Sequence, residues 1–364
     1  MFKFSELSMI NIEISSRCQA SCPMCRRNIH GSSLHPSLVL SDWSLEDFKS
    51  IINEEVLNQI NSFSFCGNTG DPAINKNLVD MCQHITDTNR NVIVSISTNG
   101  SLQKEEWWKQ LARALPPVHT VLFGIDGLED THHLYRIGTD YNKIIDNAKA
   151  FISAGGSAIW QFIKFKHNEH QVEEAQQRAK ELGFNNFILK ESSRFDSSEK
   201  FKVVDDNGDV SYYLEAASDS DLYYLTEDMV QNYKHYAQIA DIRCSAKEMK
   251  QINIDSEKKI RPCCFFDGLN PITENEYIHS ELRQVSDQQN LDLIGSLGVT
   301  DCSKKSIRDI IDGDSWQIDW AKHWCGDNKL LTCVRNCGQW KKEDVPKKLA
   351  QCFYNEVISV DSFI

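Results

Sequence analysis

Residues 14–28 read ISSRCQASCPMCRRN and place Cys18, Cys22 and Cys25 in a Cys-x3-Cys-x2-Cys spacing. The run follows an apolar, β-branched stretch of strand length at residues 9–14. A loop this short lets three thiolates bind three irons of one iron–sulfur cubane, which leaves the fourth iron open to a small molecule. Structural zinc is less favoured, because it normally takes four ligands and no histidine stands at the usual spacing. The stretch therefore predicts a cofactor site at the carboxyl end of a first strand, where α/β barrels form active sites.

Five further strand-like runs follow, at residues 62–66, 91–97, 119–125, 158–165 and 185–190. Amphipathic helical patterns separate them. The first, residues 43–60, begins with Ser44 and Asp47 at capping-box spacing. Strand–helix alternation of this kind is typical of a parallel sheet with crossover helices. We therefore predict an α/β fold, a partial (β/α)6 TIM-like barrel.

The C-terminal half has a different character. Residues 195–232 are acidic and lack clear periodicity, which predicts an irregular insertion or linker. Eight of the 13 cysteines then lie between Cys244 and Cys352, in a weakly periodic region. This density is typical of a small domain organised by metal. We expect a barrel domain at residues 1–232 and a small cysteine-rich α+β domain at residues 233–364.

Composition restricts the classes of partner. The formal net charge is −13, so the surface repels phosphate backbones and nucleic acid is not expected. No apolar run approaches the roughly 18 residues of a membrane span, and residues 1–15 make a poor secretion signal. Without export, disulfides are not expected, because they need an oxidising compartment. We predict a cytoplasmic protein whose clustered thiols bind metal.

The cysteine loop and the segments after it resemble the radical SAM (S-adenosylmethionine) superfamily, over most of residues 8–190. One departure is Met24, where the family usually has an aromatic residue. After the second strand, CGNTGDP is similar to the family's Gly-Gly-Glu-Pro segment. The resemblance implies that backbone groups of this segment bind the SAM ammonium, at Thr69, Gly70 and Asp71.

Two further strand ends carry the resemblance. The third strand ends like the family's ribose-contacting segment, with Ser97, Thr98 and Asn99. The fourth is followed by a segment similar to the Ser-x-Asp-Gly…Arg pattern of peptide-modifying members, with Asp126 and Arg136 matching and Gly124 replacing the serine. The resemblance implies that Arg136 pairs with the SAM carboxylate. It also implies two cofactors, SAM and a [4Fe–4S] cluster with an open iron.

The cysteine-rich tail resembles the SPASM and twitch extensions of radical SAM enzymes, which hold one or two auxiliary [4Fe–4S] clusters. The family's usual glycine before Cys263 is absent. A twitch-like interpretation gives one cluster, on Cys244, Cys263, Cys333 and Cys337. An interpretation as a degraded SPASM extension adds a second auxiliary cluster, on Cys325, Cys333 and Cys352, with Asp327 or Cys302.

The resemblance implies reductive cleavage of SAM to a 5′-deoxyadenosyl radical, which abstracts hydrogen from a peptide or protein side chain or backbone. The outcome would be a crosslink, an oxidation or an epimerisation. The alternatives are a sugar or aminocyclitol dehydrogenase or epimerase, and a non-enzymatic iron–sulfur carrier. A carrier is disfavoured because it has no need of SAM-contact segments. We also expect an external flavodoxin- or ferredoxin-type electron donor, and for an epimerase a thiol hydrogen donor, Cys264 or Cys302.

Overall fold

The computed structural model describes residues 1–192, 194–195, 200–220, 233–266, 269, 280–317, 320–325, 329–339 and 358–359. All six strands predicted for the barrel are present, and they pair in parallel and in chain order. They are β1 (Met9–Ile12), β4 (Ser62–Phe65), β5 (Ile93–Thr98), β6 (Thr120–Gly124), β7 (Ser157–Lys164) and β8 (Asn186–Glu191). The partial barrel is therefore confirmed.

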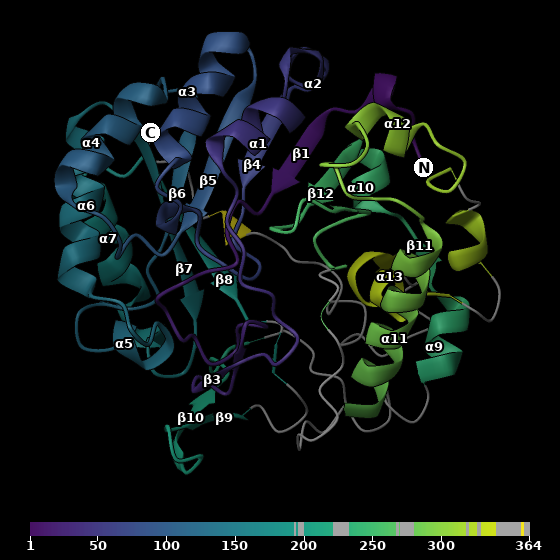
Figure 1. Cartoon of the computed structure of the whole chain (residues 1–364). Coiled ribbons are helices and arrows are strands. Elements are labelled where there is room, and N and C mark those ends of the chain that lie inside the picture. Colours follow the sequence, from purple (N-terminus) through teal and green to yellow (C-terminus); the bar gives the residue numbers. More distant parts are fainter. Residues whose placement is uncertain are drawn as a thin grey trace.

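Helices connect these strands and cover their outer side (Figure 1). They are α1 (Leu45–Ile51), α2 (Glu54–Gln59), α3 (Leu78–Thr88), α4 (Glu105–Ala114), α5 (His132–Tyr135), α6 (Tyr141–Ser153) and α7 (Val172–Glu181). Ser44 caps α1 by accepting a hydrogen bond from the Asp47 amide, as its spacing predicts. The single helix expected at residues 43–60 is wrong, because Asn53 accepts from the Val56 amide and begins a second helix.

The two faces of the barrel sheet differ in polarity. Phe63 and Phe65 of β4 point outward and pack against Phe48 of α1. On the other face, β1, β4 and β5 present polar, partly exposed residues in register, as with Asn11 and Ser64, whereas β6 to β8 also present Leu122, Ile159 and Ile188. Interiors of closed barrels are usually filled by branched apolar side chains. The hydrophobic core therefore lies between sheet and helices, and the inner face is free to bind polar molecules.

The C-terminal part extends this sheet, which the sequence pattern did not predict. Strand β12 (Gln251–Ile254) pairs in parallel with β1, and β13 (Ile260–Arg261) pairs antiparallel with β12. At the other edge, β15 (Ile358–Ser359) pairs antiparallel with β8. The sheet thus has nine strands among the described residues.

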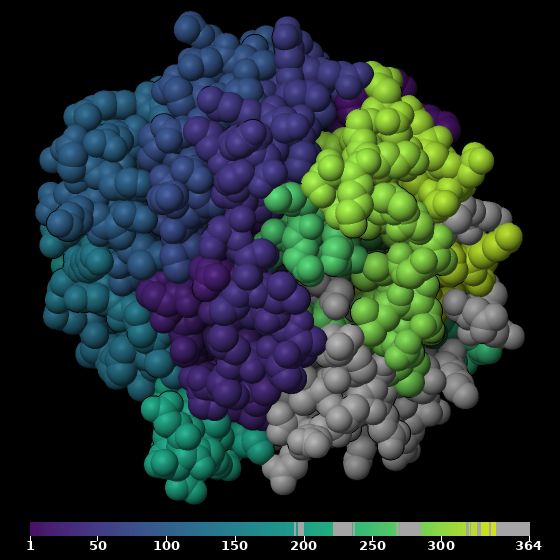
Figure 2. All heavy atoms as spheres, viewed as in Figure 1, coloured from purple at the N-terminus to yellow at the C-terminus, as the bar shows by residue number. Residues whose placement is uncertain are grey.

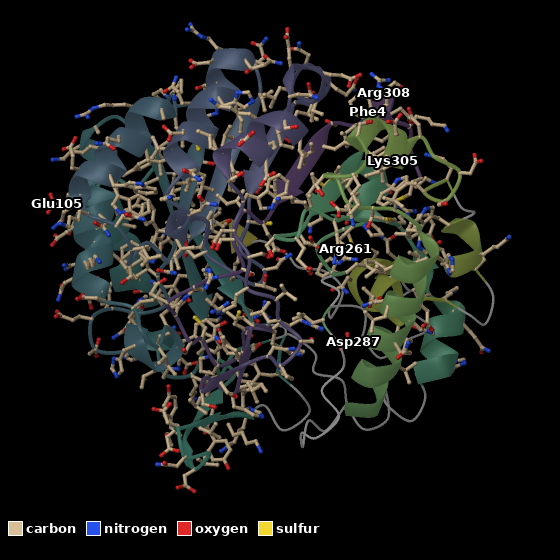
Figure 3. All side chains as sticks on the ribbon, in the orientation of Figure 1. Phe4, Glu105, Arg261, Asp287, Lys305 and Arg308 are labelled. Carbon is tan, nitrogen blue, oxygen red and sulfur yellow. The ribbon has the colours of Figure 1, made fainter. Side chains whose placement is uncertain are left out.

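The smaller C-terminal domain packs beside β1 and β12 (Figure 1). Its other elements are α9 (Tyr233–Ile239), β11 (Asp241–Ile242), α10 (Ser245–Glu248), α11 (Ser280–Ser296), α12 (Ile307–Ile311), the 3-10 helix η4 (Trp320–His323), α13 (Leu331–Cys337) and β14 (Gly338–Gln339). The N-terminal segment joins the two parts, since Phe4 lies under the Arg308 guanidinium of α12 at 4.3 Å (Figure 3). The two parts also meet in the space-filling view, where purple and green atoms are adjacent (Figure 2).

The acidic segment at residues 195–232 is not irregular throughout. Its strands β9 (Lys200–Val204) and β10 (Val210–Glu215) form an antiparallel hairpin. Phe201, Val203 and Leu214 are buried against the cysteine loop, where they pack with Cys22 and Met24. The expectation failed because a two-stranded hairpin buries only one residue in two, and the acidic turn between β9 and β10, with Asp205, Asp206 and Asp209, masks that pattern. No helix among the described residues is long and apolar enough to span a membrane.

Candidate functional site

The loop that carries the first three cysteines lies at the carboxyl end of β1. Cys18 accepts hydrogen bonds from the Ala20 amide (3.4 Å) and from Asn99 Nδ2 (3.6 Å), and Cys22 lies 4.0 Å from Arg136 Nη1. Burial raises the pKa of Cys18 to about 12 and that of Cys22 to about 11. The sulfurs are therefore shielded from water but surrounded by N–H donors, which suits anionic sulfur ligands.

The arrangement fits a cubane better than a mononuclear metal. No three His, Cys, Asp or Glu side chains among the described residues are close enough to hold a single metal ion. Cys18, Cys22 and Cys25 are nevertheless near enough to oppose one another's ionisation. In a cubane each cysteine binds a different iron, so the thiolates need not converge on one point.

Asp71 connects the predicted SAM-contact segments through hydrogen bonds. One carboxylate oxygen accepts from Thr98 Oγ1 (2.9 Å) and the Ala73 amide (2.9 Å). The other accepts from the Asn99 amide (2.7 Å) and from Asn99 Nδ2 (2.6 Å). Asn99 in turn contacts Cys18, so one network joins the second and third strand ends to the cysteine loop.

Gly70 and Ser97 complete the predicted set in this region. A Cβ atom on Gly70 would lie 2.0 Å from the Ser15 carbonyl oxygen, so only glycine allows the loop to approach β1 this closely. Ser97 lies on the partly exposed inner face of β5. The structure therefore brings the segments expected to contact SAM around one end of the barrel.

Two buried charged residues of this site were missed in the sequence. Arg27 donates to the carbonyl oxygens of Ser16, Thr69 (3.1 Å) and Cys18 (3.3 Å), and so holds the cysteine loop against the Thr69 loop. Glu13 is buried and accepts from the Thr69 amide (3.0 Å) and Thr69 Oγ1 (2.8 Å). Burial raises the pKa of Glu13 to about 7. A charged residue at the end of an apolar strand is the signal that could have identified Glu13.

Arg136 and Asp126 form a buried ion pair, with Arg136 Nε 2.5 Å from Asp126 Oδ2. The Asp126 carboxylate also accepts from the Ile163 amide (2.6 Å), so it positions the guanidinium rather than facing solvent. A Cβ atom on Gly124 would lie 2.5 Å from Arg136 Nη2. The glycine that replaces the serine of the expected pattern therefore makes room for this guanidinium.

Residues 12–190 match the family model described as the radical SAM superfamily. Residues 12–190 therefore form a radical SAM domain. Its cofactors are accordingly SAM and a [4Fe–4S] cluster. The resemblance expected from the cysteine loop and the strand ends is confirmed.

Solved structures of low sequence identity share this fold. SuiB from Streptococcus suis bound to its precursor peptide SuiA is 15% identical, with a TM-score of 0.54, covering 98% of this chain and 76% of that chain. The AdoMet-bound enzyme anSMEcpe is 15% identical, with a TM-score of 0.51, covering 89% of this chain and 87% of that chain. A comparison with curated proteins found no match.

For one further solved structure, the match covers a smaller share of that structure's own chain. SuiB without peptide is 18% identical, with a TM-score of 0.49, and the match covers 74% of this chain and 63% of that chain. This chain thus spans just under two-thirds of that structure. At these identities the likeness shows the fold alone.

A second group of cysteines lines one pocket of the C-terminal domain. The cysteines are Cys244, Cys263, Cys333 and Cys337, and we call this the four-cysteine pocket. Strand β11 pairs with β14, and the Arg243 amide donates to the Cys337 carbonyl (3.0 Å), which brings the first and last of them together. Trp320, Trp324 and Phe266 supply apolar walls.

The remaining predicted cysteines lie elsewhere. Cys325 is exposed and does not line the four-cysteine pocket. Cys302 is buried in the main hydrophobic core. Cys352 and Asp327 lie outside the described residues.

Cys264 lies between the two cysteine regions. Its carbonyl accepts from Asn68 Nδ2 (3.3 Å), a residue of the loop that carries Thr69. Its thiol is close enough to Cys66 to raise the pKa of that buried thiol further. The loop after β13 is therefore in contact with the end of the barrel where SAM contact is predicted.

Proposed function

We propose that this radical SAM enzyme modifies a peptide or protein, with an auxiliary [4Fe–4S] cluster in the four-cysteine pocket. The observation that carries the proposal is the direct connection between the two cysteine regions. Cys263 lines the pocket, and the adjacent Cys264 is hydrogen-bonded to the loop that carries Thr69 and Asp71. A substrate held between them would be within reach of both sites.

The protein's own side chains would prepare the SAM site. Asp71 fixes Asn99 and Thr98, which would face the ribose, and Arg27 holds the Thr69 loop for the ammonium. Arg136, oriented by Asp126, would donate to the SAM carboxylate through its outer nitrogens, since guanidinium groups pair well with carboxylates. With the cluster bound at Cys18, Cys22 and Cys25, SAM supplies the hydrogen-abstracting 5′-deoxyadenosyl radical.

The four-cysteine pocket fits an auxiliary cluster by its donor set. Four thiols surround one largely apolar cavity, and burial raises the pKa of Cys263, Cys333 and Cys244. Four cysteine thiolates are the usual ligands of a complete [4Fe–4S] site, and these four line one pocket. We infer one auxiliary cluster with this ligand set, in line with the twitch-like interpretation. A second cluster on Cys325 and Cys352 remains a prediction.

A peptide substrate is supported by one structural likeness. SuiB, the neighbour with a TM-score of 0.54, is bound to a precursor peptide. The polar inner face of the barrel, with Asn11, Ser64 and Ser95 in register, suits hydrogen bonding to amide groups. An external flavodoxin- or ferredoxin-type protein would supply the electron.

One reaction tests the proposal. The anaerobically reconstituted protein is mixed with SAM, reductant and peptides encoded beside its gene, and both 5′-deoxyadenosine and peptide mass are followed. We expect 5′-deoxyadenosine to accumulate faster with the cognate peptide, together with a mass change in that peptide. Unmodified peptides alongside a modified sugar or aminocyclitol, tested in parallel, would establish the small-molecule alternative instead.

A further inference from the structure

The indole N–H of Trp324 is an unusual buried donor. Trp324 follows η4, and its side chain lines the four-cysteine pocket. Its Nε1 atom is cut off from solvent and makes no hydrogen bond of normal geometry. A buried donor without a partner is destabilising, so such groups are rare unless a ligand satisfies them.

The group closest to satisfying this donor is a sulfur. The Trp324 side chain interacts with the Cys333 thiol, and both residues line the four-cysteine pocket. The Lys247 ammonium lies 5.4 Å from the centre of the Trp324 ring.

A neighbouring tryptophan provides the contrast. Trp320 lines the same pocket, but its Nε1 donates to the Trp316 carbonyl oxygen at 3.2 Å. Trp316 also has an unpaired Nε1, but it does not line the pocket. Of these three indoles, Trp324 alone combines an unpaired N–H with a place in the pocket wall.

We propose that the Trp324 indole N–H donates a hydrogen bond to sulfur at the Cys333 corner of the auxiliary cluster and raises that cluster's reduction potential. The inference rests on the auxiliary cluster proposed above. A donor to sulfur stabilises the reduced cluster, which carries more negative charge, and hydrogen bonds of this kind set cluster potentials. Trp324 is thus a positioning residue that makes the cluster a better electron acceptor.

The test compares Trp324→Phe with Trp320→Phe. Both proteins and the wild type are reconstituted anaerobically with iron and sulfide, and the auxiliary cluster is titrated potentiometrically by electron paramagnetic resonance. We expect Trp324→Phe to retain its iron but to have a lower midpoint potential. A tenfold change in the one-electron equilibrium constant corresponds to about 59 mV. Trp320→Phe removes a similar area of ring and should leave the potential at the wild-type value.

The outcomes separate the two proposals. An auxiliary signal with an unchanged potential in Trp324→Phe overturns the role of Trp324 and leaves the cluster in place. A wild-type protein that binds four irons or fewer, with one signal, overturns the auxiliary cluster itself. If Trp324→Phe loses its auxiliary iron, Trp324→His is measured, because it keeps a ring N–H. Recovery of the iron and the potential supports the hydrogen bond, and failure to recover either overturns it.

Discussion

The two cysteine regions are assembled in different ways. Cys18, Cys22 and Cys25 lie on one short loop, which Arg27 and Asn99 hold against the strand ends through hydrogen bonds. The four-cysteine pocket combines segments that are distant in the chain and joined by the short pairing of β11 with β14. A site on one loop is encoded by local spacing, whereas a site built from several segments depends on the fold of its whole domain.

The largest expected effect concerns the first region. Replacing Cys18, Cys22 and Cys25 together by Ala should abolish reductive cleavage of SAM to 5′-deoxyadenosine, because no thiolates remain to hold the cluster. Iron bound in the C-terminal domain should persist, since the two sites share no ligand. Iron analysis and chromatography of the reaction check both points. Loss of all iron from the variant would show that the regions do not assemble independently.

The next effect concerns the second region. Cys337→Ala should still cleave SAM but fail to complete an oxidative product, because the substrate radical would lack an electron acceptor. Product mass and the yield of 5′-deoxyadenosine are measured together. Cys82→Ala, which removes a buried thiol of α3 outside both sites, is the control. Cys325→Ala sharpens the result, since normal iron content and product would favour one auxiliary cluster over two.

A solvent experiment distinguishes the chemistry of the same region. In deuterated water, an epimerase that uses Cys264 as hydrogen donor would place one solvent deuterium on the product. A product two mass units lighter indicates oxidation instead. Full product formation by Cys337→Ala at the wild-type rate would contradict both the ligand assignment and the electron-acceptor role.

The difference between a site on one loop and a site built from several segments also explains which features could be predicted from the sequence. The six barrel strands and the first cysteine loop were predictable, because hydrophobic periodicity and close spacing are local signals. The pairing of β12 with β1 was not, since Gln251–Ile254 is a four-residue run whose partner is set by tertiary contacts. Arg27 was missed for a related reason. Its importance comes from three carbonyl oxygens that only the folded loops bring together.

A further prediction concerns Glu13, which lies where the two regions meet. Burial is the largest cause that raises the pKa of its carboxyl from 4.5 to about 7 in the folded protein, and Asp255 of the C-terminal domain contributes to the rise. Folding thus favours the protonated form, and this stabilising contribution is lost as pH rises from about 4.5 through about 7. Glu13→Gln should therefore be more stable than the wild type at about pH 8, by roughly 3 kcal/mol, and similar at about pH 4.5.

Urea unfolding of the anaerobic proteins at both pH values checks this, with the exposed Glu54→Gln as control. A wild-type stability that does not change relative to Glu13→Gln between the two pH values would show that folding does not raise the pKa of Glu13. It would then act only as an acceptor for Thr69.

A smaller effect is expected at Gly124. Gly124→Ser restores the serine of the expected pattern but places a Cβ atom against Arg136 Nη2. The guanidinium must shift, at a cost of about 1–3 kcal/mol. SAM affinity should fall about tenfold, as measured by isothermal titration under anaerobic conditions. Gly295→Ser is the control, because a Cβ atom there would meet no other atom within 4 Å. Unchanged affinity in Gly124→Ser would argue against contact between Arg136 and SAM.

The smallest expected effect concerns the backbone of the turn between β12 and β13. The glycine expected before Cys263 is absent. In the turn that precedes it, between β12 and β13, Lys258 adopts the left-handed φ of +66°. A left-handed conformation costs a non-glycine residue about 1–2 kcal/mol. Lys258→Gly and Lys258→Ala both remove the 2.7 Å ion pair with Asp47, so their difference isolates the backbone. The Gly variant should be more stable than the Ala variant by about 1 kcal/mol in urea unfolding. Equal stability would mean that the turn relaxes when the lysine is removed, and that its conformation depends on the ion pair.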